Sequence, residues 1–123
     1  MCFKKVGVFT ATKARLACQE VDASLPVPRN EQQNADYRSA FDKVLGTKDS
    51  YVWLGIDDKA VEGEFVDEQG QKVTPVKWAK RQPDNWAHKE HYVHMKSGGE
   101  WNDIYETARL YTVCVIPRHT EGL

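Results

Sequence analysis

Oxygen-bearing side chains gather in one polar stretch of this sequence. Gln82-Pro83-Asp84-Asn85 is followed by Glu90 and then by the pair Asn102-Asp103. Amide and carboxylate oxygens on loops suit a hard cation, and Ca²⁺ accepts irregular shells of oxygen ligands better than Mg²⁺ does. Pro83 stiffens the backbone, which lets Gln82 and Asp84 point toward one place. The stretch therefore predicts a calcium site, and the alternative is an acidic surface loop with a turn proline.

Two helices should precede this stretch. Apolar residues recur at helical spacing from Ala11 to Val21, with Thr10 as the N-cap. A second helix should run from a cap at Asn30 to Leu45 and end at Gly46. The prolines between these segments require an extended connector.

Short strands are expected at the start of the chain and again after the second helix. The segments with strand patterning are 3–10, 51–56, 92–95 and 110–116, and residues 68–71 are expected at a hairpin tip. Residues 77–88 lack regular periodicity, as is typical of functional loops. The sequence thus predicts a single α+β domain over residues 1–123, with two helices, small antiparallel sheets and a long irregular calcium-binding loop.

Composition excludes two classes of partner. Lys and Arg number 17 against 18 Asp and Glu, and a formal net charge of −1 argues against nucleic-acid binding. Because no apolar run has the length that a bilayer span needs, membrane insertion is not expected. No signal-peptide pattern is visible, so the chain is either a mature secreted form or cytosolic.

The three cysteines are Cys2, Cys18 and Cys114. A bridge from Cys18 to Cys114 would tie the front of the domain to its end, and the chain-entropy model values such a closure at roughly 4–5 kcal/mol. Cys2 would then be left over, free for an intermolecular bond. The alternative is three reduced, buried cysteines.

Several motifs occur together in a fixed order. They are Trp53-Leu54-Gly55-Ile56, Glu62-Gly63-Glu64-Phe65, Val76-Lys77-Trp78, Gln82-Pro83-Asp84-Asn85, Glu90 and Trp101-Asn102-Asp103. Their spacing resembles the C-type lectin carbohydrate-recognition domain. The resemblance runs from about Phe3 to Val115, and Cys18 and Cys114 match the long-range disulfide of that family.

This resemblance implies a secreted, non-catalytic protein that binds terminal galactose or N-acetylgalactosamine on glycans through Ca²⁺. The residues that stand at the family's calcium and sugar ligands are Gln82, Asp84, Glu90, Asn102 and Asp103. The family uses Gln-Pro-Asp for galactose types and Glu-Pro-Asn for mannose types. Exchanging acid and amide keeps the charge but reverses the order of hydrogen-bond donor and acceptor.

Two further features extend this site. Trp86 is expected to stack on the apolar face of galactose, and the alternative is a tryptophan in the core. A second calcium site is expected from Asp58, Glu62, Asn85 and Glu90, whereas the first two could equally be solvated turn residues. His91 stands where another acid would help, and histidine is a poor calcium ligand.

The chain also departs from the family pattern. The family's inner disulfide would join positions 92 and 106, which are Tyr92 and Glu106 here. Bound calcium should therefore contribute more to ordering the binding loops here than in a relative that has both disulfides. Cys2 lacks the partner that the family provides, so it is expected to link two subunits. A homo-oligomer would strengthen the weak binding of one shallow site.

Two rival functions follow from other patterns. His88, Glu90, His91 and His94 are crowded enough to suggest a zinc enzyme, but their spacing fits no helical zinc motif, and an extended chain would separate His91 from Glu90. We therefore expect no enzyme. The second rival is a lectin-like domain that binds a protein or ice without sugar. Such domains typically lose the calcium ligands, and all of these ligands remain here.

Overall fold

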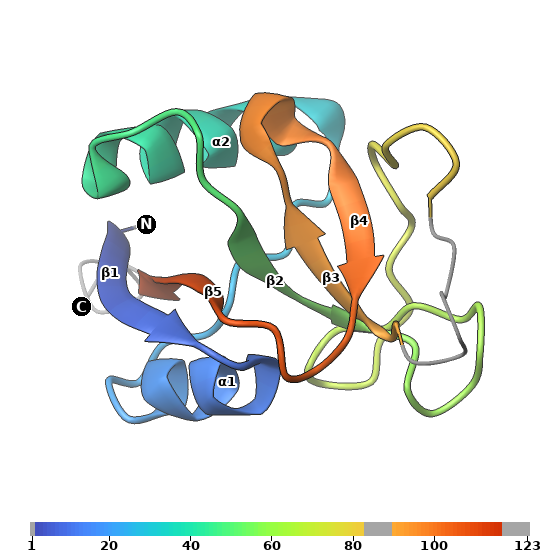
Figure 1. Cartoon of the computed structure of the whole chain (residues 1–123). Coiled ribbons are helices and arrows are strands. Elements are labelled where there is room, and N and C mark those ends of the chain that lie inside the picture. The colour runs from blue at the N-terminus through green and yellow to red at the C-terminus, as the bar shows by residue number, and fades with distance from the viewer. Residues whose placement is uncertain (1, 83–89, 117–123) are drawn as a thin grey trace, which may run out of the picture.

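A five-stranded sheet forms the centre of the molecule, with strand order β1-β5-β2-β3-β4. The computed structural model describes residues 2–82 and 90–116. The strands are β1 (Cys2–Phe9), β2 (Val52–Asp57), β3 (Tyr92–Met95), β4 (Trp101–Ile104) and β5 (Leu110–Ile116). Helices α1 (Ala11–Gln19) and α2 (Glu31–Leu45) lie on opposite sides of this sheet (Figure 1).

Both faces of the central strands are buried, because each face is covered by one helix. Alternate residues of β2 point to opposite faces. Leu54 and Ile56 pack with Phe41 of α2, whereas Trp53 packs with Ala14 of α1. This explains why the predicted strand at 51–56 reads as a continuous apolar run.

Local signals set the bounds of α2, as predicted. The side chain of Asn30 accepts a hydrogen bond of 2.8 Å from the backbone N–H of Gln33, which caps the helix start. Gly46 ends it in the left-handed region with φ 71°. Helix α1 starts at Ala11 as expected but ends at Gln19, before the predicted Val21. Thr10 stands at its N-cap without a side-chain hydrogen bond.

The sheet is mixed, which corrects the expectation of antiparallel sheets. Strands β1 and β5, β2 and β3, and β3 and β4 pair antiparallel, but β2 pairs with β5 in parallel. The chain between β2 and β5 contains the whole β3–β4 hairpin, so it is long enough for the crossover that a parallel pair requires. Strand β4 and the 3₁₀ helix Ser97–Gly99 were not predicted.

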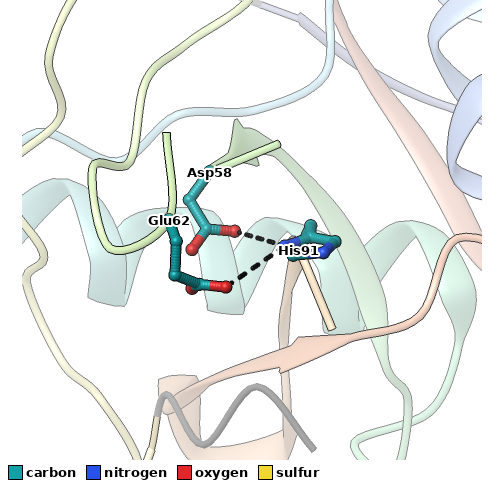
Figure 2. A group of neighbouring side chains, drawn as sticks. All are labelled: Asp58, Glu62 and His91. Carbon is teal, nitrogen blue, oxygen red and sulfur yellow. Dashed lines mark hydrogen bonds and ion pairs between the residues drawn. The ribbon is translucent and has the colours of Figure 1, made fainter. Parts of the chain in front are cut away.

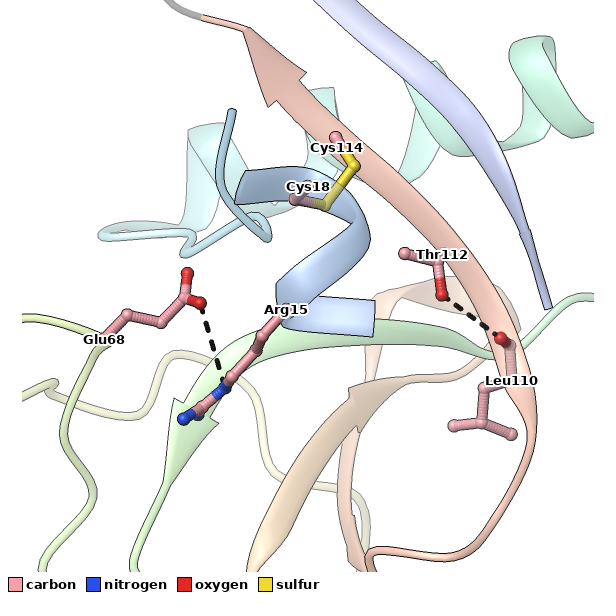
Figure 3. Close-up of a disulfide and its surroundings, with 6 residues drawn as sticks. All are labelled: Arg15, Cys18, Glu68, Leu110, Thr112 and Cys114. Atoms are coloured by element: carbon pink, nitrogen blue, oxygen red, sulfur yellow. Dashed lines mark hydrogen bonds and ion pairs between the residues drawn. A yellow bond between two sulfur atoms is a disulfide. The ribbon is translucent and has the colours of Figure 1, made fainter. Parts of the chain in front are cut away.

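One disulfide joins α1 to β5, as the resemblance implies. Cys18 and Cys114 are bonded with an S–S distance of 2.09 Å across 96 positions of sequence, and both are fully buried (Figure 3). Cys2 is a free, exposed cysteine at the start of β1. Across the described ranges, neither helix has the length and apolar character that a membrane span demands.

Candidate calcium and carbohydrate site

The β3–β4 hairpin holds two of the predicted calcium ligands on paired strands. Asn102 lies opposite His94, and Asp103 lies opposite Val93. The hairpin closes through a 2.7 Å hydrogen bond from the N–H of Lys96 to the carbonyl of Glu100. Both predicted ligands therefore stand on regular strand backbone rather than on a loop.

Trp101 anchors this hairpin to the rest of the molecule. Its side chain is fully buried, and its indole Nε1 donates a 2.7 Å hydrogen bond to Oδ1 of Asn34 on α2. The Asn34 amide in turn donates 2.8 Å to the carbonyl of Gly99. Trp78 packs edge-on against Trp101, with ring centroids 5.9 Å apart. The residue that precedes Asn102 is thus fixed from two sides.

The same residue brings the segment of Gln82 beside β4. The N–H of Trp101 donates 2.7 Å to the carbonyl of Lys77, and the N–H of Ala79 donates 2.9 Å to the carbonyl of Trp101. A turn follows, in which the N–H of Gln82 donates 3.0 Å to the carbonyl of Ala79. Gln82 therefore ends a segment that is tied to the start of the Asn102–Asp103 strand.

The atoms at this place have the character of ligands for a hard cation. The Oδ1 atom of Asn102 is buried and finds no hydrogen-bond donor within 2–82 and 90–116. A buried amide oxygen without a donor is costly unless another group, such as a cation, takes its place. The neighbouring Asp103 is only 4% exposed and carries a carboxylate. Oxygen ligands of these two types fit Ca²⁺.

Glu90 directly precedes His91 and β3, and it is half-buried. The other predicted members of the site, Asp84 and Trp86, lie outside the described residues, as do Asn85 and His88. The structure thus describes Gln82, Glu90, Asn102 and Asp103, and it places their segments on or next to the β3–β4 hairpin.

A second group of ligand-type side chains lies where β2 ends and β3 begins (Figure 2). Asp58, Glu62 and His91 each offer one ligand atom, and these atoms lie within 4.8 Å of one another. Figure 2 shows the His91 ring facing both carboxylates, with its Nδ1 at 3.2 Å from Oδ1 of Asp58 and 3.8 Å from Oε1 of Glu62. A hydrogen bond with Asp58 raises the pKa of Glu62, and burial adds to that rise.

This second group differs from the predicted auxiliary calcium site. Asp58 and Glu62 come together as expected, but His91 completes the described group and Glu90 is not a member of it. Asn85 lies outside the described residues. The contact between Asp58 and His91 arises because Asp57 pairs with Tyr92 across β2 and β3. In the sequence, His91 stands out at this place as a poor calcium ligand and, separately, in the histidine–glutamate cluster that suggests zinc.

The family model described as Lectin C-type domain matches residues 9–116. The chain belongs to the C-type lectin domain family. Carbohydrate binding without catalysis is the function that this membership implies, and it agrees with the expectation that the chain is not an enzyme.

Solved structures share the fold of this C-type lectin domain. The C-type lectin CEL-I from Cucumaria echinata is 27% identical, with a TM-score of 0.83 over 92% of this chain and 87% of that one. The mouse scavenger receptor C-type lectin carbohydrate-recognition domain is 21% identical, with a TM-score of 0.80 over 94% of this chain and 91% of that one. The herring type II antifreeze protein is 20% identical, with a TM-score of 0.79 over 94% of this chain and 90% of that one. The predicted C-type-lectin-like fold is confirmed.

The two positions without the family's inner disulfide are tied to α1 in this C-type lectin domain. Tyr92 packs edge-on against Trp53 and lies under the guanidinium of Arg15, whose Cζ is 5.5 Å from the ring centre. Arg15 also forms an ion pair with Asp57. Glu106 accepts two hydrogen bonds from α1. The N–H of Ala11 donates to its carbonyl, and the N–H of Thr12 donates to its Oε1.

The histidines considered for a zinc enzyme do not form a common site within the described residues. His94 is 3% exposed on β3, and its ring packs against Tyr51 at 5.4 Å between centroids. His91 instead faces Asp58 beyond the end of β2. Because burial and, to a smaller extent, the charge of Lys96 lower the pKa of His94 to about 4, this ring is neutral at pH 7.

Proposed function

We propose that this C-type lectin domain binds terminal galactose or N-acetylgalactosamine on glycans in a calcium-dependent manner. The observation that carries the proposal is the buried Oδ1 of Asn102, which finds no donor among the described residues, and the next residue along β4 is the buried Asp103. The Gln82-Pro83-Asp84 motif supports the galactose type, because its order of amide and acid is that of galactose-binding relatives.

The residues that would hold the calcium ion are Gln82, Asp84, Glu90, Asn102 and Asp103. The bound ion would supply positive charge and binding positions for sugar hydroxyl oxygens. The carboxylates of Asp84 and Glu90 would accept hydrogen bonds from those hydroxyls, while the amides of Gln82 and Asn102 would donate to them. Trp86 would pack against the apolar face of the sugar.

We also propose that residues 1–123 act as one secreted domain and as a homo-oligomer. The buried Cys18–Cys114 disulfide supports an oxidising compartment, because cytosolic thiols are kept reduced. The free, exposed Cys2 supports a link between two copies of the chain.

Affinity chromatography tests the proposed function. The protein should be retained on galactose-agarose in calcium and released by a chelator. Asn102→Ala should abolish retention, because it removes the amide that both the cation and the sugar would use. Glu64→Gln, which changes an exposed carboxylate outside the site, should be retained like the wild type. Retention that persists in chelator would contradict calcium dependence.

A double variant tests the sugar preference. Gln82→Glu combined with Asp84→Asn should shift retention from galactose-agarose to mannose-agarose, because the order of donor and acceptor is reversed while the charge is kept. Unchanged galactose preference would show that other residues select the sugar. A folded protein that no glycan retains would favour a protein partner instead.

A further inference from the structure

The group of Asp58, Glu62 and His91 is built from three separate places in the chain. Asp58 directly follows β2, Glu62 lies in the turn after it, and His91 directly precedes β3. The N–H of Asp58 donates a 3.0 Å hydrogen bond to the carbonyl of His91, so the two backbones are locked side by side. Two carboxylates and one imidazole thus face one another from the segments that flank β2 and β3 (Figure 2).

The histidine makes this group poorly suited to calcium, whereas two carboxylates and an imidazole are all zinc ligands. Calcium takes oxygen ligands, usually six to eight of them, whereas zinc is held by histidine nitrogen and carboxylate oxygen in small shells. Zinc bonds of about 2.0–2.2 Å place tetrahedral ligands roughly 3.3–3.6 Å apart. The distances from Nδ1 of His91 to the oxygens of Asp58 and Glu62 are 3.2 and 3.8 Å, which bracket that range.

The central carboxylate is oriented independently of His91. The Asp58 side chain is 1% exposed, and its Oδ2 accepts a 2.9 Å hydrogen bond from the N–H of Gly63. That bond leaves Oδ1 directed at the histidine, and outer-shell hydrogen bonds of this kind fix metal ligands in place. Within 2–82 and 90–116, the only basic side chain that forms an ion pair with Asp58 is His91. Among the described residues this buried carboxylate thus has no lysine or arginine partner, and buried charges in proteins are paired or coordinate metals.

We propose that Asp58, Glu62 and His91 bind a zinc-type transition-metal dication, in place of the auxiliary calcium ion expected from the sequence. The ion has three protein ligands from this group and stands apart from the carbohydrate site on β4. Its role is structural, because it ties the end of β2 to the segment that carries Glu90. Zinc binding therefore orders that segment whether or not sugar is present.

Calorimetric titration with zinc chloride tests the proposal. The protein carries Cys2→Ser, which removes an exposed thiol that would bind zinc by itself. It is stripped with chelator and titrated at two calcium concentrations, both high enough to fill the carbohydrate site. We expect one zinc ion per chain with the same affinity at both concentrations. Cobalt substituted for zinc should give the visible absorption of a four-coordinate site.

Matched variants locate the ion. His91→Ala should weaken zinc binding by more than the roughly 10- to 100-fold that loss of an outer-shell partner costs. His91→Asp should weaken zinc in the same way and strengthen calcium binding, because the group then offers oxygen alone. Glu64→Gln should leave the zinc affinity unchanged. His91 is 28% exposed, so these variants are expected to fold, and melting curves check this directly.

Three results would overturn the proposal. They are zinc binding that His91→Ala leaves unchanged, zinc affinity that falls in proportion as calcium rises, and no zinc binding at all. The last result would mean that His91 bridges the two carboxylates without a metal. Galactose retention is measured separately, so a chain that binds galactose but does not bind zinc refutes this proposal and leaves the proposed function standing.

Discussion

Adjacent residues on β4 perform different tasks. Trp101 is fully buried and bonded to Asn34, so it fixes the strand, whereas Asn102 carries a buried oxygen without a donor among the described residues. The burial of the Trp101 side chain and its hydrogen bond to Asn34 hold the backbone in place directly before Asn102. The motif Trp101-Asn102-Asp103 thus combines a structural anchor with two of the proposed calcium ligands in three neighbouring positions.

His94 makes stability depend on pH. Burial, with a smaller contribution from Lys96, lowers the pKa of this histidine from 6.5 to about 4. Well above pH 6.5 the ring is neutral in both the folded and the unfolded state, so it contributes no pH dependence there. As the pH falls from 6.5 toward 4, His94 binds a proton in the unfolded state but not in the folded state. The free energy of unfolding therefore decreases.

His94→Gln should remove that dependence. In chelator, the free energy of unfolding of the wild type should fall between pH 7 and pH 4.5 by about 2–3 kcal/mol more than that of the variant. Urea unfolding at the two pH values measures the difference. Equal losses in both proteins would show that the ring is not held neutral by burial.

At the scale of elements, α1 is the main brace of the region around β2 and β3. Cys18 bonds it to β5 (Figure 3), and Arg15 joins it to Asp57 and contacts the Tyr92 ring. Arg15 also approaches Glu68, with Nε 3.8 Å from Oε1. These contacts reach the end of β2, but no second disulfide is present within the described residues, where Cys18–Cys114 accounts for all cysteines except Cys2.

Calcium should therefore stabilise the domain markedly. At a calcium concentration roughly 100 times the Kd, binding adds about 2.7 kcal/mol to the free energy of unfolding. For a domain of this size, the melting midpoint should rise by on the order of 10 °C. Scanning calorimetry with calcium and with chelator measures the shift, and Asn102→Ala should lose it. An unchanged wild-type midpoint would refute the expectation.

Local signals allowed part of the fold to be predicted from sequence. Asn30 and Gly46 mark the ends of α2, and the bounds of β3 and β5 match the predicted strands. Strand β4 was missed because Trp101-Asn102-Asp103-Ile104 is held by pairing with β3 and by Lys77 and Ala79, none of which is local. The parallel pairing of β2 with β5 is likewise a long-range contact.

For the candidate site, the sequence likewise identified residues but not how they come together. The motifs identified Gln82, Asn102 and Asp103, but only the hydrogen bonds of Trp101 explain how their segments meet. The meeting of Asp58 with His91 depends on pairing between β2 and β3, which residue types alone do not reveal.

At the scale of the whole molecule, the free cysteine and the proposed carbohydrate site lie at opposite edges of the sheet. Cys2 stands on β1, the first strand in the spatial order, and Asn102 and Asp103 stand on β4, the last (Figure 1). In two chains joined through Cys2, each proposed carbohydrate site would lie at the edge of its sheet opposite the link and would stay accessible. Linked sites raise avidity without any new contact to the sugar.

A disulfide-linked dimer is therefore expected. Non-reducing electrophoresis should show a dimer that reductant converts to monomer, and Cys2→Ser should give monomer alone. The variant should keep the affinity for free galactose but bind a galactose-coated surface more weakly. A monomer under non-reducing conditions would rule out this link.

A crystal structure grown with calcium chloride and galactose tests the central claim most directly. The account predicts an anomalous calcium signal bounded by oxygens of Gln82, Asp84, Glu90, Asn102 and Asp103, with galactose hydroxyls on the same ion and the sugar ring against Trp86. Absence of that signal, or side chains directed away from one another in the presence of both ligands, would contradict it.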